Sequence, residues 1–196
     1  VLSVLRRTLE DPEGLVREET VKSLVKVADE GDLEYLELII EMLQDTDSGV
    51  RKSACHALAE LLDPEDLAFC RLICEGLLAL LQDAAVEVRT AATEALGRIA
   101  GVSEELREEA LTGIWRSMDH EDKAVRRSAL EALPQLVAVG HESIAKGIVR
   151  GLRDSYTETQ KKAITMIKTH LPDAKDKGDA AKELRAALIE ACGVEE

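Results

Sequence analysis

Four residues of this 196-residue chain have the types and spacing found in zinc sites. Cys70 and Cys74 lie four residues apart, and Cys55 precedes His56. Two residues four apart on a helix can present ligands to one metal ion. The segment around Cys70 and Cys74 is apolar, however, and unpaired cysteine commonly serves as a small core residue. We therefore expect these cysteines in the core, with no metal, no cofactor and no disulfide.

Two His-Glu pairs, His120-Glu121 and His141-Glu142, are the other candidate metal ligands. Both pairs fall at expected turns or helix starts, where polar side chains usually bond to nearby backbone groups. We expect them to act as turn and capping residues. The sequence also has no Gly-Lys-Ser/Thr nucleotide loop and no nucleophile elbow. It therefore predicts no catalytic residues and a protein that is not an enzyme.

The composition narrows the classes of partner. With 25 Lys and Arg against 39 Asp and Glu, the net charge is -14, which gives no electrostatic support for a grip on nucleic acid or an anionic membrane. Aromatic residues make up 2% of the chain, too few for a base-stacking surface or an aromatic-lined cofactor pocket. No apolar run approaches the roughly 18 residues of a membrane span. We expect no nucleic-acid partner and no membrane insertion.

The strongest pattern in the chain is an internal repeat. An apolar residue shortly precedes an Asp, Val-Arg follows five or six residues after that Asp, and an Ala/Leu-rich run comes next. The copies are Asp11 to Arg17, Asp45 to Arg51, Asp83 to Arg89, Asp119 to Arg126 and a degenerate Asp154 to Gln160. Successive Val positions are 34, 38, 37 and 34 residues apart, a length that fits a helical hairpin. We therefore expect each repeat to be a pair of helices.

Hydrophobic periodicity supports helices. Val88, Ala92, Ala95, Leu96 and Ile99 recur at three- and four-residue steps, as do matching residues in the other copies. The expected helix pairs are 1–9 with 15–29, 33–44 with 49–62, 65–82 with 86–100, 103–118 with 122–138, and 142–153 with 156–170. After them we expect a linker at 171–178 and a C-terminal helix within 179–196 that packs on or near the last repeat.

These residues resemble the HEAT repeat of the armadillo-like superfamily, because an Asp, a short gap, Val-Arg and helically spaced Ala and Leu recur together. The best matches are 45–61 and 83–99. The resemblance implies an all-α, right-handed α-solenoid of about five helical hairpins over residues 1–170, plus the C-terminal helix. The apolar face of residues 1–9 has no helix before it, so we also expect the chain to be a piece of a longer array or to have a further N-terminal segment.

The resemblance also implies that the repeated Asp and Arg residues form a hydrogen-bonded ladder between neighbouring repeats. The residues concerned are Asp45, Arg51, Asp83, Arg89, Asp119 and Arg126. An Asp near a helix start accepts backbone donors, and Arg offers several donors in a fixed fork. The alternative, a row of Arg residues that binds phosphate, is weaker because Asp partners at matching spacing would occupy the guanidinium groups.

The polar stripe of each second helix is the candidate binding surface, since the resemblance places second helices on the concave side. Positions two, six and ten residues after each repeat Val (Thr159 in the fifth copy) carry six basic and four acidic side chains. The predicted partner-binding residues are Lys22, Lys52, His56, Glu60, Thr90, Glu94, Arg98, Arg127, Glu131 and Lys161. Such a mixed stripe fits a protein or peptide partner with spaced charges, and it also fits an ordinary solvated helix surface.

The predicted function is a non-enzymatic scaffold or adaptor that works within a multi-subunit complex. Two enzyme families of HEAT type offer alternatives. The His-Glu pairs resemble those of deoxyhypusine hydroxylase, but two further pairs of that iron site are missing. The stretch 95–100 resembles repeats of phycobilin lyases, which makes a lyase-like enzyme subunit the runner-up. Scattered cysteines in a chain with enough apolar residues for a core favour the cytoplasm or another reducing compartment.

Overall fold

The structure is a computed structural model that describes residues 2–29, 32–138 and 141–170. The chain divides into two compact units, residues 1–110 and 111–196. The predicted linker at 171–178 and the predicted C-terminal helix at 179–196 lie outside the described residues. Every regular element among the described residues is helical, which confirms the expected all-α class.

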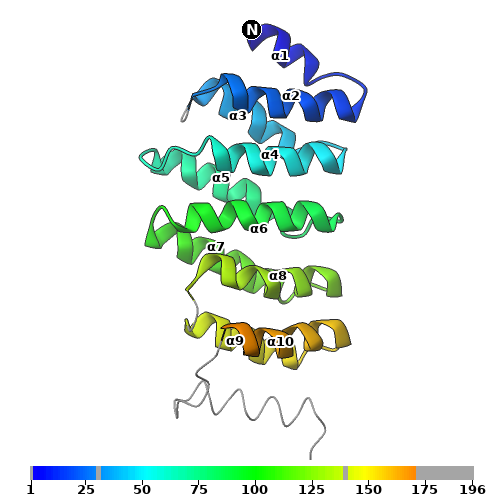
Figure 1. Ribbon diagram of the computed structural model, residues 1–196, viewed down its shortest axis with the longest axis vertical. Helices are drawn as coiled ribbons and strands as arrows, with labels where there is room; N and C mark the ends of the chain where they lie inside the picture. Colours follow the sequence, from blue (N-terminus) through cyan, green and yellow to red (C-terminus); the bar gives the residue numbers. More distant parts are fainter. Residues whose placement is uncertain (1, 30–31, 139–140, 171–196) are drawn as a thin grey trace, which may run out of the picture. The chain divides into compact units, whose positions relative to one another are not determined.

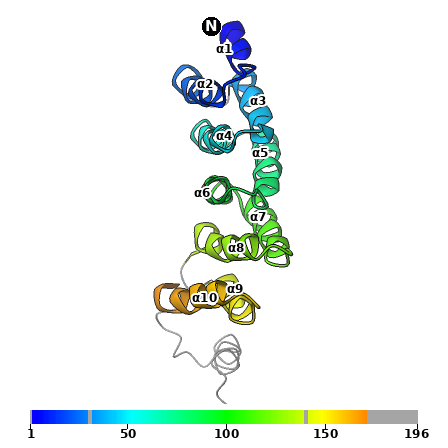
Figure 2. The same cartoon turned by 90° about the vertical axis from the view of Figure 1, so that its right-hand side faces the viewer.

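The first unit is built from three helix pairs. Its helices are α1 (Leu2–Thr8), α2 (Gly14–Val27), α3 (Leu33–Glu41), α4 (Ser48–Glu60), α5 (Leu67–Leu80) and α6 (Val86–Ala100). Within this unit α2, α4 and α6 lie side by side in one layer, and α1, α3 and α5 form a second layer (Figure 1, Figure 2). Because α4 packs against both α2 and α6, the second helices of three successive repeats form one continuous surface.

The second unit contains α8 (Lys123–Leu136), α9 (Glu142–Leu152) and α10 (Thr157–His170), and α7 (Glu104–Ser117) spans the boundary between the units. In the second unit α10 packs against both α8 and α9. The observed helices agree with the sequence prediction to within two residues at most ends. The exception is the helix predicted at 33–44, which ends as an α-helix at Glu41 and continues as a single 3-10 turn, Met42–Gln44.

The predicted apolar stripes form the core. In α6, Val88, Ala92, Leu96 and Ile99 are fully buried, and the equivalent residues of α4 and α8 are also buried. The first copy differs, because Leu24 is buried but Val16 is 39% and Val27 51% exposed. The stripe of α2 therefore meets the core at its centre only, and these two valines are not the core residues that the pattern predicted.

Successive helix pairs are joined by a ladder of Arg–Asp ion pairs between neighbouring repeats. In the first unit, Arg51 donates from Nε and Nη2 to the two carboxylate oxygens of Asp83 at 2.7 and 2.9 Å. Its Nη1 donates to the backbone oxygens of Asp45 and Thr46 at 2.7 and 3.1 Å. One guanidinium thus joins the turn of its own repeat to the Asp of the next, as the family resemblance implied.

The same arrangement occurs at two further positions, and the degenerate copy keeps half of it. Arg17 binds Asp45 at 2.7 and 2.6 Å, and Arg126 binds Asp154 at 2.7 and 2.9 Å. Gln160 stands where the other copies have Arg, and its Nε2 donates to the backbone oxygen of Asp154 at 2.8 Å. Because the guanidinium donors of these ladder arginines are occupied, a phosphate-binding Arg row is not supported.

The ladder predicts a loss of stability in acid. Hydrogen bonds from Arg17 and Arg126 lower the pKa of Asp45 and Asp154, and at Asp83 partial burial opposes the shift but hydrogen bonds from Arg51 and the backbone outweigh it. A carboxylate whose folded pKa is lowered stabilises the fold above its unfolded pKa of about 3.9 and loses that contribution as the pH falls through the folded value.

We therefore expect the urea midpoint of unfolding to be flat near neutral pH and to fall once the pH drops below about 4. Denaturant titrations at a series of pH values measure this. Asp45→Asn removes one of the shifted carboxylates, so its midpoint should depend less steeply on pH below that point. An unchanged slope in the Asp45→Asn variant would contradict the assignment.

Two glycines let α9 approach its neighbours closely. A Cβ atom at Gly147 would overlap Cδ1 of Leu133 on α8. A Cβ atom at Gly151 would lie 2.6 Å from Cδ2 of Leu130 on α8 and 3.1 Å from Cβ of Ala163 on α10. The spacing of four residues places both glycines on one side of α9. The close packing of α9 in the second unit therefore depends on glycine at these two positions, because any larger residue would meet its neighbours.

Candidate functional site

The candidate site is the outward side of the second helices, here called the second-helix face and described for each unit separately. It consists of the predicted residues Lys22, Lys52, His56, Glu60, Thr90, Glu94, Arg98, Arg127, Glu131 and Lys161. Eight of them are exposed, and Arg127 and Glu131 are half-buried. The face is polar because the opposite side of each helix carries the buried apolar stripe.

In the first unit this face combines residues from three adjacent helices. Lys22 comes from α2, Lys52, His56 and Glu60 come from α4, and Thr90, Glu94 and Arg98 come from α6. Side-by-side packing of these helices (Figure 1) brings residues that are far apart in sequence onto one surface. That assembly is what the repeat pattern predicted.

Side chains at the α2 end of this surface bind one another. Lys22 Nζ lies 2.8 Å from Glu18 Oε1 and 2.7 Å from Glu19 Oε1, and these hydrogen bonds raise the pKa of Lys22. Glu18 also accepts from Ser53 Oγ at 3.3 Å and lies against Gly49, so it fills the contact between α2 and α4. Glu18, which belongs to the polar stripe, is thus partly a packing residue.

Charged residues of α4 and α6 remain available. Within the described ranges, no ion pair involves Lys52, Glu60, Glu94 or Arg98, and all four are exposed. The part of the second-helix face formed by α4 and α6 therefore offers two exposed cations and two exposed anions that have no ion-pair partner among the described residues. A ligand with spaced charges of both signs can bind there without breaking existing pairs.

The second unit carries a smaller and internally paired part of the face. Arg127 Nε lies 3.1 Å from Glu131 Oε1, and Lys162 of α10 reaches the same oxygen at 3.3 Å. Lys161 pairs with Glu158 at 2.8 Å. Exposed pairs of this kind contribute little stability, but because of them this part of the face has fewer unpaired charges among the described residues than the part formed by α4 and α6.

The three cysteines among the described residues are core residues, as expected. Cys55, Cys70 and Cys74 are free and buried, and the Cys70 thiol donates to the backbone oxygen of Asp63 at 3.2 Å. Burial raises the pKa of Cys55 and of Cys74 to about 12, so both are protonated thiols near neutral pH. A thiol in that state is a poor nucleophile and a poor metal ligand.

The two His-Glu pairs are capping and turn residues. His120 Nδ1 accepts from the backbone N–H of Asp122 at 3.0 Å, and His141 Nδ1 accepts from that of Ser143 at 3.2 Å, at the start of α9. Across the part of the chain that the structure describes, no group of His, Cys, Asp and Glu could hold a metal ion. Among the same residues, no helix is long and apolar enough to cross a membrane.

Sequence reasoning missed one polar surface on the first-helix side of the second unit. An open depression is lined by Trp115, near the end of α7, by Lys146 and Arg150 of α9, and by Arg153, which follows that helix. The signal was present in the sequence, since three cations at 146, 150 and 153 share one helical face. The repeated Asp and Val-Arg pattern lies at the starts of the second helices, so it does not predict a site on a first helix such as α9.

Paired helices of repeated length, stacked around a continuous apolar stripe and tied by a repeated ion-pair ladder, define an α-solenoid, a class of helical repeat protein. The chain belongs to the HEAT-repeat proteins. Models of HEAT repeats match residues 2–71 and 73–103, which together span just over half of the chain. None of the curated proteins has a matching sequence.

Solved structures of similar fold support this assignment. A structure of the Pds5–Scc1 complex matches 96% of this chain with a TM-score of 0.62 and 15% identity, over 31% of that chain. YibA of Escherichia coli matches 95% of this chain with a TM-score of 0.58 and 17% identity, over 69% of that chain. A designed armadillo repeat protein in complex with the peptide (KR)4 matches 97% of this chain with a TM-score of 0.50 and 23% identity, over 81% of that chain. At these identities the likeness concerns the fold.

Proposed function

We propose that this HEAT-repeat chain is a non-enzymatic scaffold or adaptor that binds an extended protein segment along the second-helix face of α4 and α6, as part of a larger assembly. The observation that carries the proposal is a set of exposed charges on these adjacent helices that have no ion-pair partner in the described part of the chain: Lys52, Glu60, Glu94 and Arg98. A partner with charges of both signs would gain pairs there at little cost in existing contacts.

Two further observations support a scaffold. The HEAT and armadillo folds generally serve as scaffolds, and the designed armadillo repeat protein of similar fold was solved with a bound peptide. The described cysteines are buried, protonated thiols and the His-Glu pairs are caps, so the residues that first suggested metal chemistry have structural roles. The free thiols also support our proposal of a reducing compartment.

The test is reversal of two of the unpaired charges. The double variant Lys52→Glu, Arg98→Glu should lose most of its partner, because two attractive contacts become repulsive, a change of about tenfold or more in affinity. Its thermal unfolding should match that of the wild type, since both side chains are exposed. Affinity purification from the native source with quantitative mass spectrometry identifies the partner, and titration with the purified partner measures the affinity.

The matched control is Arg6→Glu, Arg7→Glu on α1, which makes the same change of net charge in the same unit but away from the second-helix face. It should retain the partner. Equal retention by both double variants would place the binding surface elsewhere. Pigment or iron that copurifies with the wild type in the absence of a protein partner would replace the scaffold proposal with the enzyme alternative.

A further inference from the structure

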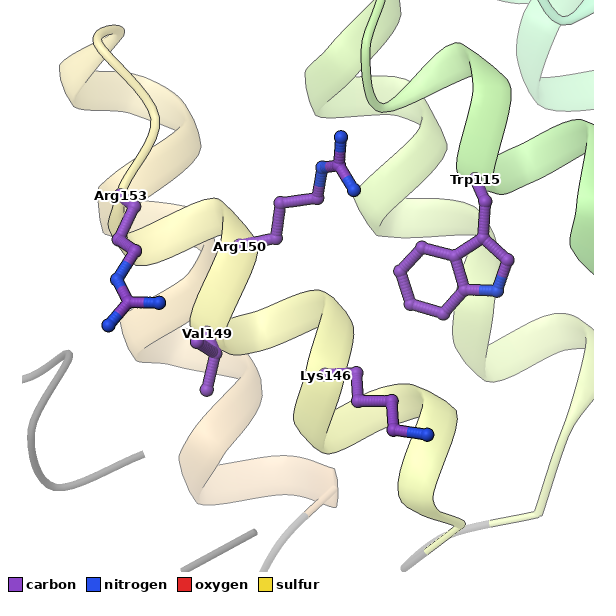
Figure 3. Close-up of a pocket in the computed structure, with 5 residues that line it drawn as sticks. All are labelled: Trp115, Lys146, Val149, Arg150 and Arg153. Atoms are coloured by element: carbon purple, nitrogen blue, oxygen red, sulfur yellow. The ribbon is translucent and has the colours of Figure 1, made fainter. Parts of the chain in front are cut away.

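An open depression on the second unit combines cations with an aromatic side chain. It has a volume of about 380 Å³ and is lined by Trp115, Lys146, Val149, Arg150 and Arg153. Figure 3 shows the Trp115 indole projecting from α7, while Lys146 and Arg150 extend from α9 toward the same side. This surface belongs to first helices, so it is separate from the second-helix face.

The cations of this depression already bind carboxylates of their own chain. Arg150 forms an ion pair with Asp119, and Lys146 Nζ lies 3.1 Å from Glu142 Oε1. All four side chains are at least 43% exposed, so these pairs are weak and exchange readily with other carboxylates. The donors of the depression thus have the charge and the geometry that carboxylate ligands need.

The spacing of the cations matches that of acidic residues in an extended peptide. Lys146 and Arg150 lie one turn apart on α9, about 6 Å at 1.5 Å per residue, and Arg153 follows at the C-terminal end of the helix. Carboxylates two residues apart on an extended chain point to the same side and are separated by about 7 Å. Val149, which is 8% exposed, and the half-buried Trp115 offer an apolar contact between the charges.

We propose that this depression, here called the Trp115 pocket, binds an acidic protein segment in which an apolar residue lies between carboxylates. The carboxylates pair with Lys146, Arg150 and Arg153, and the apolar side chain packs on the Trp115 indole. A peptide is favoured over nucleic acid because the chain carries a net charge of -14 and the pocket has a single aromatic residue, which gives one stacking surface. The proposal is independent of the second-helix face.

The chain contains one tryptophan, so its fluorescence reports directly on this pocket. We expect an acetylated Glu-Glu-Leu-Glu-Glu peptide to shift Trp115 emission to shorter wavelength in a saturable way, because the leucine displaces water from the indole. The affinity should fall as salt is added, as expected for exposed charges. Isothermal calorimetry at the same concentrations gives an independent affinity.

Matched variants and peptides decide the outcome. The double variant Lys146→Gln, Arg150→Gln should bind the peptide about tenfold more weakly, since two exposed charge contacts are lost, whereas Lys168→Gln on α10 should bind as the wild type does. Circular dichroism verifies that each variant is folded.

Four results would overturn the proposal. The first is the absence of a saturable response in both emission and calorimetry, and the second is binding of the uncharged Gln-Gln-Leu-Gln-Gln peptide as tightly as the acidic peptide. The third is a loss of affinity in Lys168→Gln equal to that in the Lys146→Gln, Arg150→Gln variant. The fourth is tighter binding of a single-stranded oligonucleotide than of the acidic peptide.

Discussion

Arg51→Ala is expected to lower the free energy of unfolding by about 2–3 kcal/mol. Charged hydrogen bonds contribute more than neutral ones, and a partner left without its counter-charge in a part-buried site keeps the cost of its desolvation. Here the change removes both bonds to Asp83 and the donors to the backbone oxygens of Asp45 and Thr46. Side-chain exposures of 15% for Arg51 and 8% for Asp83 moderate the loss relative to a fully buried pair. Urea unfolding followed by circular dichroism measures it.

Two other variants make the Arg51 prediction specific. Lys52→Ala changes the next residue, which is exposed and outside the ladder, and should alter stability by about 0.5 kcal/mol or less. Arg51→Gln should fall between the two, because Gln160 shows that an amide keeps the bond to the backbone of its own repeat. If Arg51→Ala proved as stable as Lys52→Ala, the ladder would contribute little to the free energy of unfolding.

Gly151→Val is expected to destabilise the second unit by about 3 kcal/mol, at the upper end of the cost of overpacking. The first added carbon meets Leu130 at 2.6 Å and Ala163 at 3.1 Å. The Leu130 methyl can rotate away, but the Ala163 Cβ is fixed to the backbone of α10, so the helices must separate. Because Trp115 lies in the second unit, its fluorescence during urea unfolding follows this change.

Replacement of a glycine on α5 should change stability differently from replacement of Gly151. Gly76→Ala adds a methyl whose one close neighbour is the movable Cδ1 of Leu43 at 2.8 Å, and alanine favours a helix over glycine by up to about 1 kcal/mol. We expect Gly76→Ala to be neutral or slightly stabilising and Gly151→Ala to be destabilising. Equal effects of the two alanine variants would show that close packing does not govern Gly151.

The internal repeat in the sequence determined most of the secondary structure. Val, Ala, Leu and Ile at three- and four-residue steps specify a helix with one apolar face, and the interval between copies leaves room for a second helix and two turns. The pattern was least informative at α2, where Val16 and Val27 follow the apolar phase but are exposed. A residue is buried only where another helix covers it, and a local pattern does not contain that information.

The sequence also determined which side chains point outward on each second helix, because helical phase places Lys52 and Arg98 opposite Ala54 and Leu96. It did not determine which of them are paired. Lys22 and Arg127 bind acidic neighbours, whereas Lys52 and Arg98 have no ion-pair partner among the described residues. Pairing depends on rotamers and on contacts between helices, so only the folded chain distinguishes the two groups.

By itself, then, the sequence specified an all-α repeat protein and its helix pairs, since these follow from periodic patterns within single repeats. The resemblance to HEAT repeats implied the Arg–Asp ladder, and the apolar segment around Cys70 and Cys74 indicated buried cysteines. Tertiary structure alone decided the partners of the ladder arginines across repeats, the dependence of α9 on Gly151, and the gathering of Trp115 with the cations of α9. The physical reason is distance along the chain. Contacts within a repeat are fixed by helical phase, whereas contacts between repeats depend on how helices pack in three dimensions.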